Sequence, residues 1–487
     1  MNGTAALVSC YAISRPGRVT ASGGSNANVY PNCRSVSHQR NARHGNRSSV
    51  CSVLLEWYAR LWAKPELPQP KQSWLPTLNW ARVNPWPEGT KPRPADGAEV
   101  TAFAKDLMHP RWIHILPNGD VLVAEAASLP ADSWNPRAIA QNWAMRRARS
   151  ITENANRITL LRDADGDGVA EVRETFLENL RQPFGMALIG DQFYVANTDS
   201  VVRYTYQEGV TRIAGEGTKV VDLPVGHHWT RTLIASPDGS KLYITVGSGS
   251  NIGEKGMGIE VDRGTIMEYD ISTERVRVFA SGLRNANGMA FEPITGSLWT
   301  VVNERDEIGD DTPPDYLTSV VDGGFYGWPY SYWGKIVDQR VEPRRPDLVA
   351  RSITPDYALG AHTSALGLAY YEGTALPEPF RRGMIIGQHG SWNRSSYSGY
   401  KVVFVPFENG KPNGPPIDLL AGFVNDDGSK EVFGRPVGVA VDRSGAVLVA
   451  DDAGDTIWRV TGPAGPTRQQ SLNGQGDAPR TPPKAVQ

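Results

Sequence analysis

The sequence predicts an all-β fold, a six-bladed β-propeller, and three observations support this prediction. Glycine (50 residues), proline (36) and tryptophan (14) are frequent, which is typical of many short strands joined by tight turns. Of the 487 residues, 40% are hydrophobic and 21% are charged, so the chain can bury a large core. A strand–turn–strand unit also recurs six times, at intervals of roughly 50 to 70 residues, as the blades of a propeller do.

Each repeat has an apolar strand, a turn rich in Pro, Asp, Asn and Gly, and a second strand of alternating apolar residues. The copies span residues 109–124, 182–196, 231–245, 285–299, 366–387 and 435–450. A propeller carries its functional groups on loops at one mouth of its central channel. We therefore expect the residues that precede each first strand to converge on the channel axis.

Composition divides the chain into four parts. Residues 1–63 are expected to form a disordered or targeting-like extension, because the first 50 residues contain no Asp or Glu. Residues 64–98 form a Pro-rich linker or surface strap, residues 99–463 the propeller and catalytic domain, and residues 464–487 a disordered tail. All three cysteines lie within the first 51 residues, so the propeller can contain neither a disulfide nor a thiolate metal site.

A short helical insertion is expected at residues 135–149, where Pro136 and apolar side chains at helical spacing are combined with three arginines. We interpret it as a surface helix with a solvated basic face; docking of an electron partner is the alternative. The formal charge of −2 does not indicate a nucleic-acid-binding protein. No apolar run reaches the roughly 18 residues that a transmembrane span needs.

Two adjacent histidines, His227 and His228, stand just before the third repeat, three and four residues ahead of Arg231. A histidine that faces the channel is a natural general base, since its ordinary pKa is near neutrality. The alternative is a histidine hydrogen-bonded within the rim. Arg231 could hold an oxyanion or cap a blade.

Arginines occupy the equivalent position in two further repeats. Arg284, followed by Asn285, precedes the fourth repeat, and Arg435 is the first residue of the sixth, directly before its strand. Two arginines that enter one channel repel each other unless an anion lies between them, and Arg binds carboxylates in bidentate fashion. A ligand with several carboxylates would satisfy both; local pairing of each arginine with Asp or Glu is the alternative.

Two acidic segments are candidates for calcium, a hard ion that takes six to eight oxygen ligands. The first, residues 303–311, carries the candidate ligands Asp306, Glu307, Asp310 and Asp311; a solvated acidic loop is the alternative. The second, residues 163–174, matches the ligand spacing of an EF-hand loop. Its flanks are strand-like, which favours a hairpin tip with an optional Ca²⁺.

Three motifs together resemble the soluble quinoprotein sugar dehydrogenases, and within them the L-sorbosone dehydrogenase branch. The motifs begin at Gly282 (Gly-Leu-Arg-Asn), Asn303 (Asn-Glu-Arg-Asp-Glu) and Tyr326 (Tyr-Gly-Trp-Pro), and the resemblance covers about residues 100–462. It implies pyrroloquinoline quinone (PQQ) above Ca²⁺ in the propeller mouth. It also implies oxidation of an aldose, a sorbosone-like aldehyde or a polyol, a cytochrome or quinone as electron acceptor, and a periplasmic location, although no signal peptide is legible.

The resemblance also implies roles for particular residues. Arg284 and Asn285 would contact the quinone and its carboxylates, and the loop at Asp306 and Glu307 would give backbone carbonyls to Ca²⁺. Arg435 would be one of two sixth-blade arginines that contact the cofactor.

Lys401 or Arg394 would match the family's fifth-blade lysine. Alignment on the strand selects His228 as the base, whereas counting back from Arg231 selects His227; we favour His228. The base would take the proton of the substrate hydroxyl while hydride passes from the same carbon to the quinone.

The sequence departs from the family pattern at Val437, where a second sixth-blade arginine is expected, and at Ser248, where glucose-oxidising members carry Asp. These departures imply a reorganised cofactor site and a substrate other than glucose. Two other functions are a Ca²⁺-dependent propeller lactonase or hydrolase and a non-catalytic propeller that binds a partner. A neutral lactone does not need the arginines, and simple binding leaves the His, Arg and carboxylate groups unexplained.

Overall fold

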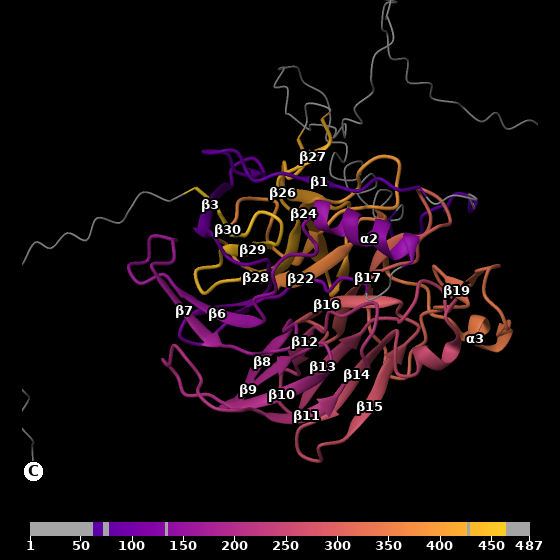
Figure 1. The fold of residues 1–487 in the computed structure, drawn as a ribbon, viewed down its shortest axis with the longest axis horizontal. Helices are drawn as coiled ribbons and strands as arrows, with labels where there is room; N and C mark the ends of the chain where they lie inside the picture. The colour runs from indigo at the N-terminus through magenta and orange to yellow at the C-terminus, as the bar shows by residue number, and fades with distance from the viewer. Residues whose placement is uncertain (1–61, 72–76, 132–134, 426–428, 464–487) are drawn as a thin grey trace, which may run out of the picture. The chain divides into compact units, whose positions relative to one another are not determined.

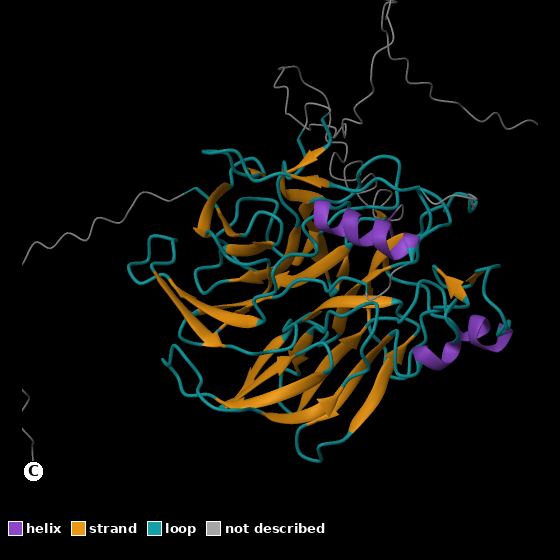
Figure 2. Ribbon diagram, in the orientation of Figure 1, coloured by secondary structure: helices purple, strands orange, loops and turns teal. Residues whose placement is uncertain are grey.

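The computed structural model describes residues 62–71, 77–131, 135–425 and 429–463. Strands are the main regular secondary structure of this part of the chain (Figure 2), and most of them belong to six sheets arranged as the blades of a β-propeller (Figure 1). The predicted all-β, six-bladed fold is confirmed. Nearly all of the predicted extension, and the predicted tail from residue 464, lie outside the described residues.

The first four blades each contain four antiparallel strands, in sequence order from the channel outward. Blade 1 comprises β4 (Pro110–Ile115), β5 (Val121–Glu125), β6 (Arg157–Arg162) and β7 (Val172–Leu177), and blade 2 comprises β8 (Met186–Ile189), β9 (Gln192–Ala196), β10 (Ser200–Thr205) and β11 (Thr218–Asp222). Blade 3 comprises β12 (Leu233–Ala235), β13 (Lys241–Val246), β14 (Thr265–Asp270) and β15 (Val276–Ser281), and blade 4 comprises β16 (Asn285–Phe291), β17 (Leu298–Asn303), β18 (Pro314–Ser319) and β21 (Tyr357–Ala361).

Blades 5 and 6 include strands from the start of the described chain. Blade 5 comprises β22 (Ala365–Tyr371), β23 (Gly383–Gln388), β24 (Lys401–Glu408) and β26 (Ile417–Ala421), extended by β2 (Arg93–Pro94), with β25 (Lys411–Pro412) paired to β24. Blade 6 comprises β28 (Pro436–Val441), β29 (Val447–Asp451), β30 (Thr456–Thr461) and β3 (Glu99–Ala104). Since β3 pairs with β30, with Val100 opposite Val460, the two ends of the propeller are joined in one sheet and the ring is closed.

Two short strands of the Pro-rich segment at residues 64–98 pair with strands near the propeller rim. β1 (Arg82–Val83) pairs in parallel with β27 (Glu431–Val432), and β2 pairs with β26. Between them, the Trp86 indole donates to Asp451 over 2.8 Å. At these points the segment lies on blades 5 and 6 as a strap.

Glycines in the repeats allow the innermost strands to approach one another. A Cβ atom on Gly185 would lie 2.3 Å from the backbone nitrogen of Leu233, and one on Gly367 would lie 2.2 Å from the carbonyl of Val437. Gly288 and Gly438 meet the next inner strand in the same way. A side chain at these positions would force neighbouring blades apart, which explains the Gly-x-Ala pattern of the repeats.

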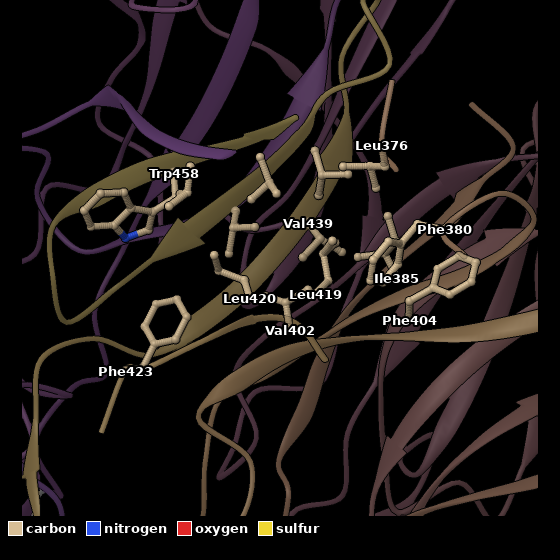
Figure 3. Close-up of a cluster of buried hydrophobic side chains, with 14 of the residues drawn as sticks. Leu376, Phe380, Ile385, Val402, Phe404, Leu419, Leu420, Phe423, Val439 and Trp458 are labelled. Carbon is tan, nitrogen blue, oxygen red and sulfur yellow. The ribbon is translucent and has the colours of Figure 1, made fainter. Parts of the chain in front are cut away.

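The hydrophobic core lies between the blades. Between blades 5 and 6, Val402 and Phe404 of β24 and Leu420 of β26 are buried against Val439 of β28 and Trp458 of β30 (Figure 3). Similar buried clusters lie between other neighbouring blades. Burial of large apolar side chains on both faces of each sheet stabilises the ring and holds its loops in place.

The predicted helical insertion is α2 (Pro136–Arg147), which Asn135 caps by accepting from the Ala138 amide over 2.8 Å. The smaller elements are η1 (Met257–Glu260), β19 (Ser331–Tyr332), β20 (Ile336–Val337) and α3 (Pro346–Arg351). After α2, Arg149 pairs with Asp455 and donates to the Ala453 carbonyl over 2.7 Å. That arginine therefore anchors the insertion to blade 6. No helix of the described residues is long and apolar enough to cross a membrane.

Candidate functional site

The candidate site is the mouth of the propeller where each inner strand begins and each second strand ends. Loops from these two kinds of position contact one another: His228 contacts Ser248, Arg284 contacts Glu304, and Arg435 contacts Asp452. In each of these three blades, the residue before the inner strand therefore lies beside the loop after the second strand of the same blade. The mouth contains two polar clusters, one on the acidic loop after β17 and one around Asp452.

The imidazole of His228 is held as a neutral base. Its Nδ1 lies 2.8 Å from the carbonyl oxygen of Ser248 and 3.1 Å from the Ser248 hydroxyl. A carbonyl can only accept, so Nδ1 carries the proton and Nε2 is the acceptor nitrogen. Burial, followed by the charges of His227 and Arg284, holds the pKa of His228 well below its usual range.

The two histidine rings pack edge to face, with centroids 4.7 Å apart. His227 is exposed at the mouth, and desolvation by its neighbours, followed by the charge of Arg284, lowers its pKa to about 4. Both rings are therefore neutral at neutral pH, which a general base requires.

Arg231 braces the loop that carries these histidines. Its side chain is fully buried, and its guanidinium donates to the carbonyls of His228 (2.7 Å), Thr230 (2.8 Å) and Pro224 (2.7 Å). Burial, with the charge of Arg263, lowers its pKa to about 9. The structure thus gives Arg231 backbone partners within the loop.

Arg284 is saturated by the acidic loop and its neighbour. Nε and Nη2 donate to the carbonyl and side-chain oxygens of Asn251 (3.2 and 3.0 Å), and Nη1 donates to the carbonyls of Asn303 (3.4 Å) and Glu304 (2.6 Å). Nη2 also donates to Asp306 over 3.1 Å. An arginine has five N–H donors, and here each has an acceptor. Arg284 therefore organises the mouth and has no donor left for a ligand.

Next to Arg284, the Oδ1 atom of Asn285 is buried without a hydrogen-bond partner in the described part of the chain. Asp306, on the other side, lies between Arg284 and His362, whose Nδ1 is 3.4 Å away. Burial lowers the pKa of His362, but its hydrogen bond to Asp306 and the charge of that carboxylate outweigh burial and raise the pKa overall. The loop is thus held by ion pairs on both sides of Asp306.

The second cluster surrounds the fully buried carboxylate of Asp452. Arg435 Nε lies 3.0 Å from it, His389 Nε2 2.9 Å and His109 Nε2 3.4 Å, and Arg111 is ion-paired with the same carboxylate. Burial raises the pKa of Asp452, but the surrounding positive charges outweigh burial and hold it well below its usual value. Asp452 is thus ionised and shared by two guanidinium groups.

The charges of this cluster do not balance. Burial lowers the pKa of His109 to about 3 and that of His389 to about 4, so neither imidazole is charged at neutral pH. Two buried cations, Arg111 and Arg435, therefore share one carboxylate. Arg111 Nε and Arg435 Nη2 are buried without a hydrogen-bond partner among the residues that the structure describes.

This cluster adjoins the histidine pair. The Arg111 guanidinium lies over the ring of Trp229, 5.5 Å from its centroid, and Trp229 follows His228 in the chain. Unpaired buried donors beside a neutral base define a mouth that can hold an anion next to a proton acceptor.

Of two predicted cofactor residues on the fifth blade, Lys401 lies outside both clusters and Arg394 contacts the far end of the acidic loop. Lys401, at the start of β24, is ion-paired with Asp418 of β26 over 2.7 Å. Arg394 donates to the Asp310 carbonyl (3.0 Å) and pairs with Asp311 (2.8 Å). The fifth blade sends His389 to the Asp452 cluster instead of either cation.

Sequence reasoning missed Arg111, His109, His389 and Asp452. The repeat could have found three of them, because His109 precedes an inner strand and His389 and Asp452 each follow a second strand. Arg111 lies within β4 and carries no such positional signal.

The four predicted metal residues do not form one set of carboxylate ligands. Asp306 pairs with Arg284, Asp311 pairs with Arg394, and Asp310 accepts from the Ser395 amide over 3.1 Å. The Glu307 amide donates to Asn393 over 3.0 Å.

In the described ranges, a grouping that could hold a metal ion consists of Asp163, Asp165, Asp167 and Glu171, whose ligand atoms lie within 4.8 Å of one another. These residues form the tip of the β6–β7 hairpin, as the strand-like flanks predicted. Exposed carboxylates in such a turn need no ion, and nothing links this hairpin to the mouth.

Fold and site together define a six-bladed propeller with a charged mouth. The chain belongs to the TrAA12-like family, whose pattern matches residues 92–315 and 346–463. It is 28% identical over 301 residues to an uncharacterized protein of Borreliella burgdorferi, covering 59% of this chain and 77% of that protein. It is 25% identical over 256 residues to a pyrroloquinoline quinone-dependent sugar dehydrogenase of Hypocrea jecorina, covering 43% of this chain and 59% of the relative.

Solved structures support the fold. A carbohydrate-active enzyme of family AA12 from Trichoderma reesei, solved with calcium, superposes with a TM-score of 0.63 at 22% identity, covering 76% of this chain and 97% of that structure. The PQQ domain of pyranose dehydrogenase from Coprinopsis cinerea, in its holo form, gives a TM-score of 0.61 at 20% identity, covering 82% and 99%. The full-length Coprinopsis enzyme is longer, and this chain spans 44% of it.

Proposed function

We propose that the protein is a PQQ-dependent dehydrogenase that oxidises a sugar or a related aldehyde or polyol. The buried pair of Arg111 and Arg435 is the observation that carries this proposal, because two guanidinium groups that share one carboxylate need a further anion. Family membership and the quinone-dependent relatives support the choice of PQQ. PQQ is a tricarboxylate, so it matches both the charge and the planar donor geometry of the arginines.

The described residues fit such a cofactor at the Asp452 cluster. Arg435 Nη2 and Arg111 Nε are the unused donors, and Asn285 Oδ1 is an unused acceptor on the opposite cluster. Val437 stands where the family pattern has a second sixth-blade arginine. In this protein Arg111, from blade 1, would supply that second positive charge. When bound, PQQ would supply the ortho-quinone that accepts the hydride.

The protein supplies the proton acceptor. In the proposed reaction, Nε2 of His228 takes the proton of the substrate hydroxyl while the hydride leaves the same carbon. The Ser248 carbonyl holds the productive tautomer by accepting from Nδ1. Burial keeps the ring neutral until it receives the proton, and Arg231 fixes the loop that carries it.

The substrate in this proposal is an aldose, a sorbosone-like aldehyde or a polyol, with glucose disfavoured. Ser248 is fully buried, and its hydroxyl donates to the Ser250 carbonyl over 2.7 Å. Because this residue is a serine, it supplies no carboxylate to orient a sugar. A periplasmic location and a cytochrome or quinone as electron acceptor complete the proposal and follow from the family resemblance alone.

Calcium, which the resemblance also implies, does not fit the acidic loop in its described arrangement. The carbonyls of Asp306 and Glu307, which would hold the ion, both accept hydrogen bonds from Arg340. We therefore assign no catalytic step to a metal ion.

Reconstitution tests the proposal. The purified chain is incubated with PQQ, freed of excess cofactor, and assayed for reduction of an artificial dye with a panel of aldoses, aldehydes and polyols. We expect stoichiometric uptake of the quinone and dye reduction with at least one substrate. Lactone hydrolysis without PQQ would favour the lactonase instead, and failure of every substrate would favour a binding propeller.

A further inference from the structure

The acidic loop contains a cation of its own. The backbone carbonyls of Asp306 and Glu307 converge on one nitrogen, Nη1 of Arg340, at 3.1 and 3.4 Å. The Asp306 carbonyl also accepts from the side-chain amide of Asn251 over 3.2 Å. Because a carbonyl oxygen has two lone pairs, the two donors leave it no lone pair for a metal ion.

The guanidinium of Arg340 is held rigidly at this position. Its Nε and Nη2 donate to the two oxygens of Asp338 over 2.9 and 2.7 Å, a bidentate pair. Asp338 is in turn held by the fully buried Arg305 over 3.1 Å. Burial raises the pKa of Asp338, but hydrogen bonds from Arg340 and the charges of both arginines outweigh burial and lower it to about 2. The Arg340 side chain is 15% exposed.

The ion pairs around the loop are balanced. Three guanidinium groups pair with three carboxylates: Arg284 with Asp306, Arg305 with Glu304 and Asp338, and Arg340 with Asp338. A calcium site instead gathers an excess of negative oxygen ligands around the divalent ion. A Ca²⁺ ion on these carbonyls would lie against Arg340, with no additional carboxylate of the network to offset the repulsion.

We propose that Arg340 takes the place of a metal ion in the mouth of this protein. Its guanidinium is the fixed cation on the acidic loop, and Asp338 and Arg305 position it. This inference rests on the proposed function for the identity of the neighbouring ligand, PQQ. It departs from the calcium site that the family resemblance implies, and it predicts that the protein binds PQQ equally well without Ca²⁺.

Calorimetric titration with Ca²⁺ tests directly whether the ion can bind to the carbonyls of Asp306 and Glu307. This experiment needs no PQQ. The titration uses the full chain with Asp163→Asn and Asp165→Asn, which removes the hairpin cluster as a second binding site. We expect no Ca²⁺ to bind. Binding of one Ca²⁺ per chain would overturn the inference.

Measurements of PQQ binding test the expectation that the protein binds PQQ equally well without Ca²⁺. Quenching of tryptophan fluorescence gives the PQQ affinity in excess EGTA and in excess Ca²⁺ for the wild type, Arg340→Met and Arg340→Lys. We expect equal affinities for the wild type under both conditions. For Arg340→Met we expect a loss of at least about tenfold in EGTA that Ca²⁺ partly restores, with a smaller loss for Arg340→Lys, which keeps the charge but not the bidentate pair.

A wild type that binds PQQ about tenfold or more tightly with Ca²⁺ than with EGTA would contradict the inference. Arg344→Met is the matched control, because Arg344 lies four residues away in the chain and pairs with the exposed Glu342. Thermal unfolding of each variant shows whether it is folded. If PQQ fails to bind under either condition, the proposed function fails, while the Ca²⁺ titration still decides the role of Arg340.

Discussion

The two clusters of the mouth differ in how evenly their charged groups are paired, although Asn285 Oδ1 and Glu304 Oε1 beside the acidic loop are also buried without a partner among the described residues. On the acidic loop, arginines and carboxylates pair evenly, and every N–H of Arg284 has an acceptor. Around Asp452, two arginines share one carboxylate, and buried donors have no partner among the described residues. A buried charged network is stable without a ligand only when it is fully paired. The charges of the acidic loop are therefore balanced without a ligand, and we propose that the excess positive charge around Asp452 holds the ligand.

The largest expected effect is on catalysis. His228→Ala removes the proton acceptor, and we expect dye reduction by the PQQ-loaded enzyme to fall by about 10²-fold or more. His227→Ala is the matched control, because it removes the neighbouring ring and leaves His228 with its contact to the Ser248 carbonyl. A larger loss in His227→Ala than in His228→Ala would move the base to His227.

The next effect separates the charge-balanced acidic loop from the Asp452 cluster by stability. Arg284→Met leaves Asp306 and several buried carbonyls without their donor, and we expect the free energy of unfolding to fall by about 3 to 5 kcal/mol. Arg435→Met leaves Arg111 and Asp452 as a balanced pair, so it should cost the cofactor-free protein much less. Urea unfolding of both variants without PQQ measures the difference. Equal losses would show that the two clusters are equally satisfied.

The pH dependence of stability sharpens the comparison. The pKa of His389 is lowered to about 4 in the folded protein, whereas the ordinary pKa of a histidine is about 6.5. Between these two pH values the unfolded chain therefore binds more protons than the folded protein. This histidine stabilises the fold above pH 6.5, and its contribution is lost as the pH falls toward 4. We expect His389→Gln to make the decline of unfolding free energy between pH 6.5 and 4 shallower than in the wild type.

Denaturant unfolding at a series of pH values checks this prediction. The difference between the two proteins isolates His389 from opposing groups such as Asp315, whose pKa burial raises to about 6. Parallel curves for the wild type and His389→Gln would show that the ring is not held neutral.

The smallest effect is expected at the rim of blade 5. Lys401 pairs with Asp418, and both side chains are partly exposed, so Lys401→Met should change the unfolding free energy by less than about 1 kcal/mol. It should leave PQQ binding unchanged, since the ammonium group contacts neither cluster. A marked loss of PQQ affinity in this variant would place Lys401 at the cofactor.

Strand periodicity and turn residues were sufficient to predict the propeller, because its blades repeat the same local pattern and its glycines mark where inner strands meet. The candidate positions in the mouth could be predicted for the same reason: His228, Arg284 and Arg435 each precede an inner strand. The partners of these residues could not. Whether Arg284 faces a ligand or its own loop depends on Asn251 and Glu304, which come from two different blades.

Two contacts of the site had no local signal at all. Arg111 and Asp452 are 341 residues apart in the chain, and they meet only because blade 6 closes against blade 1. Arg340 reaches the acidic loop from a segment beyond β20, where no repeat pattern predicts its direction. Long-range closure and irregular loops therefore set which charged groups surround the predicted residues of the mouth.

Equilibrium binding of PQQ to the wild type, Arg111→Met and Arg394→Met tests the assignment of the ligand site most directly. Both variants remove one guanidinium, but Arg111 lies in the Asp452 cluster and Arg394 on the rim. We predict one PQQ per wild-type chain, an affinity about tenfold or more lower for Arg111→Met, and unchanged affinity for Arg394→Met. Wild-type affinity in Arg111→Met, or no binding by the wild type, would contradict the account.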